Sequence, residues 1–173
     1  MNTWICLLRA VNVGGTGKFP MAALRRLCAE AGLEDVRTYI ASGNVVCRSR
    51  LDETGVKRAL EQALETHAGK PVGVLVRSPD DLSAVQMDNP FSDAPGNRCV
   101  AIFLDAAPSA DALQAARGQK NEQMALGRRE IYVHYGDGMA DSKLRIPAAV
   151  NGTARNMNTI AKLIAMAREP VGD

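Results

Sequence analysis

The order of expected strands and helices repeats once along this 173-residue chain, and that repeat constrains the fold more than any other feature. In residues 1–77, apolar runs and helical stripes predict the order strand, helix, strand, strand, helix, strand. The same order begins again at residue 99. We therefore predict an α+β fold of two tandem ferredoxin-like β-α-β-β-α units packed together.

Turn and capping residues bound the elements of the first copy. The expected elements are a strand over 4–11, a helix from Pro20 to Gly32, strands over 36–40 and 45–48, a helix from an Asp52 cap to Gly69, and a strand over 72–76. The first strand is a nearly continuous apolar run, which is typical of a strand buried on both faces. These residues give the predicted domain 1–77.

A connecting segment, 78–98, is expected to hold a short helix from Ser78 to Val85 and then a linker. The second unit, 99–173, should contain a strand over 99–104, a helix from Ser109 closed by Gly118, a hairpin of 122–126 with 130–135, and a last helix through Met157 and Ile164. No closing strand is evident, so this unit is predicted to be incomplete. Residues 136–155 read as a long polar loop, and loops beyond about 12–15 residues are usually functional or disordered.

Composition and charge exclude several classes of protein. No apolar run approaches the roughly 20 residues that span a bilayer, and the N-terminal residues resemble a strand more than a signal peptide. With 21 basic and 19 acidic residues, the net charge of +2 does not indicate a nucleic-acid or membrane partner. We expect a cytoplasmic protein.

Five sequence blocks resemble a bacterial family known only as a domain of unknown function, DUF1697. They are 7–15 (LLRAVNVGG), 38–46 (TYIASGNVV), 89–91 (NPF), 142–144 (SKL) and 153–159 (TARNMNT). The similarity extends over essentially the whole chain, with Met157 standing where the family usually has Trp. The resemblance implies the tandem ferredoxin-like fold and implies no activity.

The glycine-rich segment 14–18 is the first candidate ligand site. It does not match a phosphate-binding loop, because Asn12 stands at the first glycine position and Phe19 where Ser or Thr is required. Converging backbone N–H groups, a following helix and Lys18 could still bind an anion. The alternative is a flexible strand-to-helix turn.

Two arginines are the other candidates for holding an anion. Arg9 lies within an otherwise apolar strand, where an unpaired guanidinium is costly. It either forms a structural ion pair, with Asp35 or Glu34, or faces a polar cleft and binds an anion. Arg155 precedes the last helix, which Thr153 or Asn156 could cap.

Together these observations favour a protein that binds a small anionic ligand, with or without turning it over. The predicted ligand-binding residues are Arg9, Asn12, Gly14, Gly15, Thr16, Lys18, Ser142, Lys143, Arg155, Asn156 and Asn158. We expect the loop after the first strand and the start of the last helix to lie close together. The alternatives are a nucleic-acid-binding module, which 4% aromatic residues disfavour, and a non-catalytic interaction module. Catalytic residues, enzyme activity and oligomeric state are left open.

The cysteines and histidines predict neither a metal nor a cofactor. Cys6, Cys28, Cys47 and Cys99 are widely spaced within apolar patterns. Purified protein should therefore contain no stoichiometric zinc or iron, and no cysteine pair should be bridged. Elemental analysis and thiol titration check this, and loss of folding under a chelator would contradict it.

Overall fold

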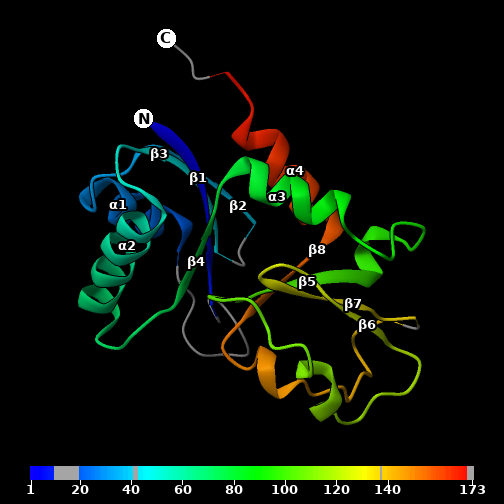
Figure 1. Cartoon of the computed structure of the whole chain (residues 1–173). Coiled ribbons are helices and arrows are strands. Elements are labelled where there is room, and N and C mark those ends of the chain that lie inside the picture. Colours follow the sequence, from blue (N-terminus) through cyan, green and yellow to red (C-terminus); the bar gives the residue numbers. More distant parts are fainter. Residues whose placement is uncertain (10–19, 41–42, 137, 171–173) are drawn as a thin grey trace. The chain divides into compact units, whose positions relative to one another are not determined.

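The computed structural model describes residues 1–9, 20–40, 43–136 and 138–170 (Figure 1). In these residues the chain is an α+β protein with two four-stranded antiparallel sheets and four α-helices. It divides into two compact units, Met1–Leu82 with Leu163–Asp173, and Ser83–Lys162. This division differs from the predicted one because the last helix, α4 (Met157–Ala167), contributes residues to both units.

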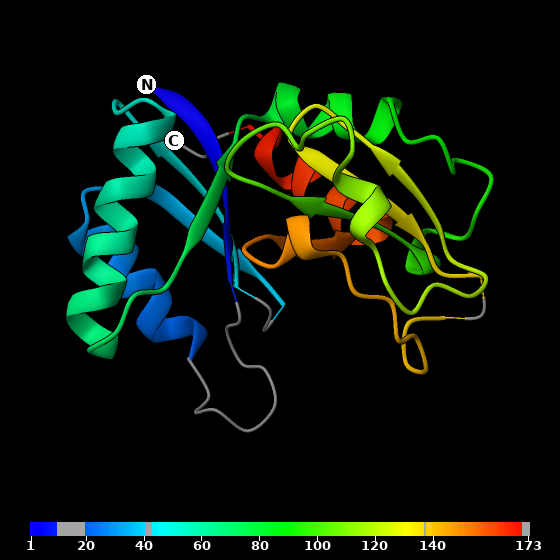
Figure 2. The ribbon, with the colours of Figure 1, turned by 60° about the horizontal axis from the view of Figure 1, so that its bottom comes forward.

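The first unit contains a sheet covered on one face by two helices. Its strands are β1 (Asn2–Leu8), β2 (Glu34–Tyr39), β3 (Asn44–Ser49) and β4 (Val74–Arg77), in the spatial order β2-β3-β1-β4. Figures 1 and 2 show α1 (Met21–Glu30) and α2 (Glu53–Ala68) on the same side of this sheet. The buried cluster beneath the helices comprises Cys6, Leu8, Leu24, Leu27, Cys28, Leu33, Val45, Cys47, Val56, Leu60, Leu64, Val74 and Val76.

Local capping fixes the ends of α2 as the sequence predicts. The Asp52 side chain accepts a hydrogen bond from the backbone N–H of Gly55 at 2.8 Å. Gly69 ends the helix with φ of 74°, a left-handed conformation that favours glycine. The short helix α3 (Pro79–Met87) is also confirmed, and its start is closed by a reciprocal pair of bonds between Ser78 and Asp81.

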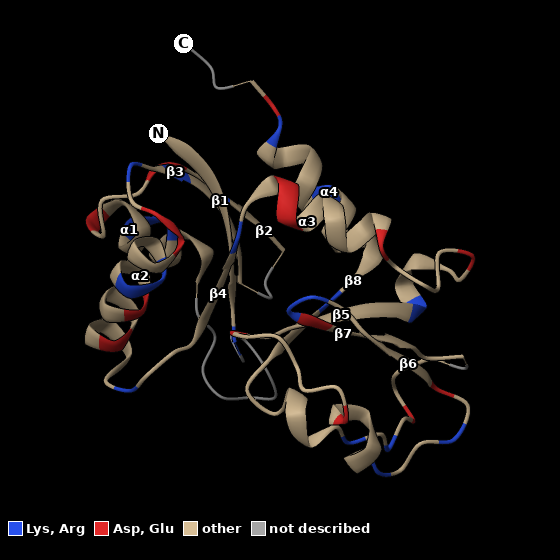
Figure 3. Ribbon diagram, in the orientation of Figure 1, with Lys and Arg blue, Asp and Glu red and all other residues tan. Residues whose placement is uncertain are grey.

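The free edge of the first sheet is protected by two charged residues of α2. β4 is an edge strand, and the backbone N–H of Val74 donates to Glu61 Oε2 at 3.0 Å. Lys57 Nζ donates to the Val74 carbonyl at 2.6 Å and to Glu61 at 2.9 Å. Figure 3 shows both signs of charge along α2. This closed arrangement satisfies polar groups that an edge strand otherwise exposes for pairing with another chain.

The second unit contains a sheet with the corresponding strand order. Its strands are β5 (Cys99–Phe103), β6 (Gln123–Leu126), β7 (Glu130–His134) and β8 (Thr153–Asn156), in the order β6-β7-β5-β8. One face carries a second buried cluster, formed by Val100, Ile102, Leu104, Ile131, Val133 and Leu144. Leu144 comes from the long segment after β7, so that segment covers part of this face.

Two predictions for the second unit are wrong. The helix expected from Ser109 to Gly118 is only a short 3-10 helix, η2 (Ala112–Ala115). The Ser109 hydroxyl donates to the Asp111 carboxylate and forms no helix cap, and the segment has little apolar surface to bury. A closing strand, β8, does exist. Its buried side chains, Thr153 and Arg155, are polar. The sequence therefore lacks the alternation of apolar buried and polar exposed residues that usually indicates a strand.

The remaining helical elements are short 3-10 helices. The segment after α3 contains η1 (Gly96–Arg98), and the long segment after β7 contains η3 (Pro147–Ala149). No helix among the described residues is long and apolar enough to cross a membrane.

Replacing Glu61 with Ala should lower the free energy of unfolding by about 1–2 kcal/mol, because the Val74 N–H and Lys57 lose their acceptor. Glu65→Ala is the matched control, since this exposed residue lies on the same helix. Urea denaturation of both variants tests the edge arrangement. Equal losses of stability would show that the Glu61 bonds contribute nothing beyond helix composition.

Candidate functional site

A pocket of about 360 Å³ lies in the second unit, against one end of its buried cluster. Its lining residues are Ile102, Tyr135, Leu144, Arg145, Ile146, Pro147, Ala149 and Val150. Ile102 comes from β5, and all the others come from the segment that follows β7. The sequence therefore located a segment that lines a pocket, although it did not identify the pocket's own residues.

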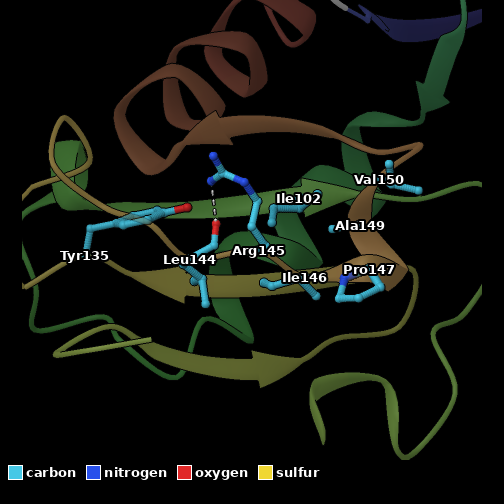
Figure 4. A pocket seen from close by; sticks show the side chains of 8 residues that line it. All are labelled: Ile102, Tyr135, Leu144, Arg145, Ile146, Pro147, Ala149 and Val150. Carbon is cyan, nitrogen blue, oxygen red and sulfur yellow. Dashed lines mark hydrogen bonds between the residues drawn. The ribbon is translucent and has the colours of Figure 1, made fainter. Parts of the chain in front are cut away.

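Figure 4 shows how the polar groups of this pocket lie. The Tyr135 ring stands on one side with its hydroxyl pointing toward Arg145, and Pro147, Ala149 and Val150 stand on the other. Arg145 is exposed, and its Nη1 donates to the Leu144 carbonyl at 3.0 Å. The site thus combines one cation and one phenol with a mainly apolar wall.

The segment holding Arg145 is fixed by a short antiparallel bridge to the end of the preceding loop. Arg145 N donates to the Arg117 carbonyl, and Arg117 N donates to the Arg145 carbonyl, both at 2.8 Å. The next residue, Gly118, has φ of 73°, and a Cβ there would lie 2.1 Å from the Lys143 carbonyl oxygen. Glycine is therefore required where these two segments meet.

The buried carboxylate of Glu122 supports the same segment at Ser142, three residues before Arg145. Glu122 Oε2 accepts from the Ser142 hydroxyl at 2.5 Å, and its Oε1 accepts from the Lys120 backbone N–H at 2.7 Å. Both bonds lower the pKa of Glu122 below its usual range, and the bond from Ser142 has the larger effect. Ser142 also accepts from Leu144 N at 3.3 Å. Ser142, a predicted ligand residue, thus orders the segment behind the pocket.

The Tyr135 phenol is neutral near pH 7. Burial raises its pKa, and the nearby negative charge of Glu122 raises it further, while Arg145 acts in the opposite direction. A neutral phenol is a hydrogen-bond donor. Tyr135 can therefore donate to an anion that Arg145 attracts.

Five predicted ligand residues lie outside the described residues: Asn12, Gly14, Gly15, Thr16 and Lys18. Arg9 belongs to the first unit, where its backbone N–H donates to the Gly73 carbonyl at 2.9 Å. Its half-buried side chain runs over Gly73, where an added Cβ would lie 3.3 Å from Arg9 Cδ. The expected proximity of the glycine-rich loop to the start of α4 remains a prediction.

The other predicted residues belong to the second unit. Arg155 is 7% exposed, and its Nη1 donates to Thr153 Oγ1 at 2.7 Å and to the Ala154 carbonyl at 2.9 Å. Burial lowers the pKa of Arg155 to about 10. Asn156 caps α4 by accepting from Thr159 N at 2.8 Å, as one of the two sequence interpretations held. Lys143 is exposed and lies beside the bridge.

Asn158 is exposed on the first turn of α4 and lies against Gly96, where a Cβ would come 2.1 Å from its Oδ1. The structure thus places Ser142 and Lys143 near the pocket, while Asn156 and Asn158 lie at the start of α4. None of the six predicted ligand residues that the structure describes is among those that line the pocket.

All four cysteines are free and buried. Burial raises the pKa of Cys28 to about 12 and that of Cys99 to a smaller extent, so both are protonated thiols near pH 7. Within the part of the chain that the structure describes, no three His, Cys, Asp or Glu side chains are grouped to hold a metal ion.

Replacing Ser142 with Ala should raise the pKa of Glu122 toward its ordinary value. A depressed carboxyl pKa stabilises the fold above the unfolded pKa, about 4.3, and that stabilisation disappears as the pH falls through the folded pKa. The stability difference between wild type and Ser142→Ala should therefore be largest at neutral pH and shrink in acid. Urea denaturation across pH and a carboxyl NMR titration measure it. Ser109→Ala, which removes an exposed serine–carboxylate bond, should show no such trend.

The comparisons with known proteins agree with the fold and name no activity. No curated protein matches the chain. Among solved structures, the conserved bacterial protein SP0830 from Streptococcus pneumoniae is similar with a TM-score of 0.76 and 24% identity, over 96% of this chain and 98% of that one. The family described as "Protein of unknown function (DUF1697)" matches residues 1–132, which include Ile102 but not the rest of the pocket. The chain belongs to the DUF1697 family.

Proposed function

We propose that this protein binds a small organic anion in the pocket of its second unit. Arg145 supplies the positive charge, Tyr135 supplies a neutral hydrogen-bond donor, and the apolar wall receives the body of the ligand. The observation that carries the proposal is that one exposed cation stands in a pocket of about 360 Å³ whose other lining residues, apart from Tyr135, are apolar. Ligand pockets commonly have this composition, with a few polar groups in an apolar lining.

The arrangement supports binding more than catalysis. Arg145 and Tyr135 can attract and orient an anion, but neither is poised as a base or nucleophile, because a guanidinium carries only hydrogen-bond donors and the raised pKa of Tyr135 keeps its phenol neutral. A general acid role for Tyr135 would require a bound substrate with a basic leaving group. Binding is therefore the simpler assignment for this set of side chains.

The finer assignment of the fold is part of the same proposal. Both units follow the ferredoxin-like plan, and the matching strand orders β2-β3-β1-β4 and β6-β7-β5-β8 support it. In the first unit α1 and α2 connect the strands. In the second unit the corresponding connections are η2 and the segment between β7 and β8, which we call the pocket segment. Because neither connection is an α-helix, the pocket segment is available to form a binding site.

The test is a thermal-shift screen across organic phosphates, nucleotides and carboxylates, followed by calorimetry on the compounds that raise the melting temperature. Arg145→Gln should weaken binding of such a compound by about 1.5–3 kcal/mol, because a charge-assisted hydrogen bond is lost. The unliganded variant should lose no stability, since Arg145 is exposed.

Arg128→Gln is the matched control, because Arg128 is an exposed arginine of the same unit outside the pocket. It should keep wild-type affinity. Equal loss of affinity in both variants would point to general surface charge, as in a nucleic-acid-binding module, and retention on heparin would support that alternative. Binding unaffected by Arg145→Gln would place the ligand elsewhere, and the predicted residues Arg9 and Lys18 would then be the next to replace.

A further inference from the structure

We infer that Arg117 is a second anion-binding residue of this pocket, and that the ligand carries a doubly charged head group such as a phosphate monoester. This inference rests on the proposed function and specifies its ligand class. It arises from the bridge that joins the pocket segment to the preceding loop.

The bridge places the two arginine side chains on one face. Arg117 and Arg145 exchange both backbone hydrogen bonds, each at 2.8 Å. Residues paired in this way in antiparallel structure have Cα atoms about 5.5 Å apart and project their side chains to the same side. The two arginine side chains therefore start next to each other on one face, and Arg145 lines the pocket.

Such a pair is unfavourable in the free protein. Like charges directly opposite each other in a β-ladder destabilise it. Among the described residues, neither Arg117 nor Arg145 forms an ion pair with a carboxylate. The nearby carboxylate of Glu122 is already bonded to Ser142 and the Lys120 amide. Among the described residues, the chain thus brings two cations together without an ion-paired carboxylate on either.

A dianion matches this arrangement better than a monoanion does. Two guanidinium groups carry two positive charges, and each planar group can donate two parallel bonds to phosphate oxygens. A phosphate monoester carries nearly two negative charges at pH 7. The apolar wall of Ile146, Pro147 and Val150 then indicates an apolar organic body on the ester rather than free phosphate.

The first test needs no ligand. Arg117→Gln should raise the melting temperature of the unliganded protein at low ionic strength by about 1–3 °C, because it relieves the repulsion. The gain should disappear in high salt, where exposed charges are screened. Lys120→Gln is the control, since it removes one charge from the same exposed loop at a position that is not opposite Arg145. An equal gain in Lys120→Gln, or a loss of stability in Arg117→Gln, would contradict the paired arrangement.

The second test compares phenyl phosphate and benzoate, which share a ring and differ in head-group charge. Calorimetry should show wild-type protein binding phenyl phosphate about tenfold more tightly, and Arg117→Gln should abolish that preference. If benzoate binds through Arg145 with no preference for phenyl phosphate, and Arg117→Gln changes nothing, the inference fails while the proposed function stands. If no organic anion binds in an Arg145-dependent manner, the proposed function itself fails.

Discussion

Two neighbouring contacts hold the pocket segment of the second unit in place, and the site depends on both. The Arg117–Arg145 bridge fixes the backbone that carries Arg145, and Glu122 fixes Ser142 on the same segment. Gly118 allows the bridge, because any side chain there would collide with the Lys143 carbonyl. A segment of this length has a large conformational entropy, so a fixed cation at its centre needs such ties to residues that are distant in sequence.

The first unit was predictable because its elements are marked by local signals. Asp52 and Gly69 bound α2 by capping chemistry that involves residues only three or four positions away. Continuous apolar runs mark β1 and β3, and the two strands pair with Cys6 opposite Val45, both within the buried cluster beneath the helices. The edge arrangement of Lys57, Glu61 and Val74 was not visible in the sequence, since it joins a helix to a strand 13 residues or more away.

The second unit was harder to predict because its sequence signals compete. Ser109 with the alanines that follow favours a helix, yet the serine hydroxyl bonds to Asp111 and Leu113 is the one large apolar side chain of the segment 109–118. For β8 the sequence misleads in the opposite direction, because it conceals a strand that the structure contains. Thr153 and Arg155 occupy its buried positions. Hydrogen bonds to Thr153 Oγ1 and to the Ala154 carbonyl reduce the cost of burying Arg155, and the sequence does not reveal these bonds.

The difference between buried and exposed positions explains why the sequence pointed to Arg9 and Arg155 and not to Arg145 in the pocket. Arg9 and Arg155 attract notice because an arginine within or beside an apolar strand requires an explanation. Arg155 proves to be buried, and its Nη1 donates to two neutral acceptors of its own strand. Arg145 lies instead in the long segment after β7 and is exposed, and an exposed arginine in a loop needs no explanation from the sequence. What distinguishes Arg145 from other exposed arginines is its position opposite Arg117 beside an apolar wall, and that pairing spans 28 positions of the chain, from 117 to 145.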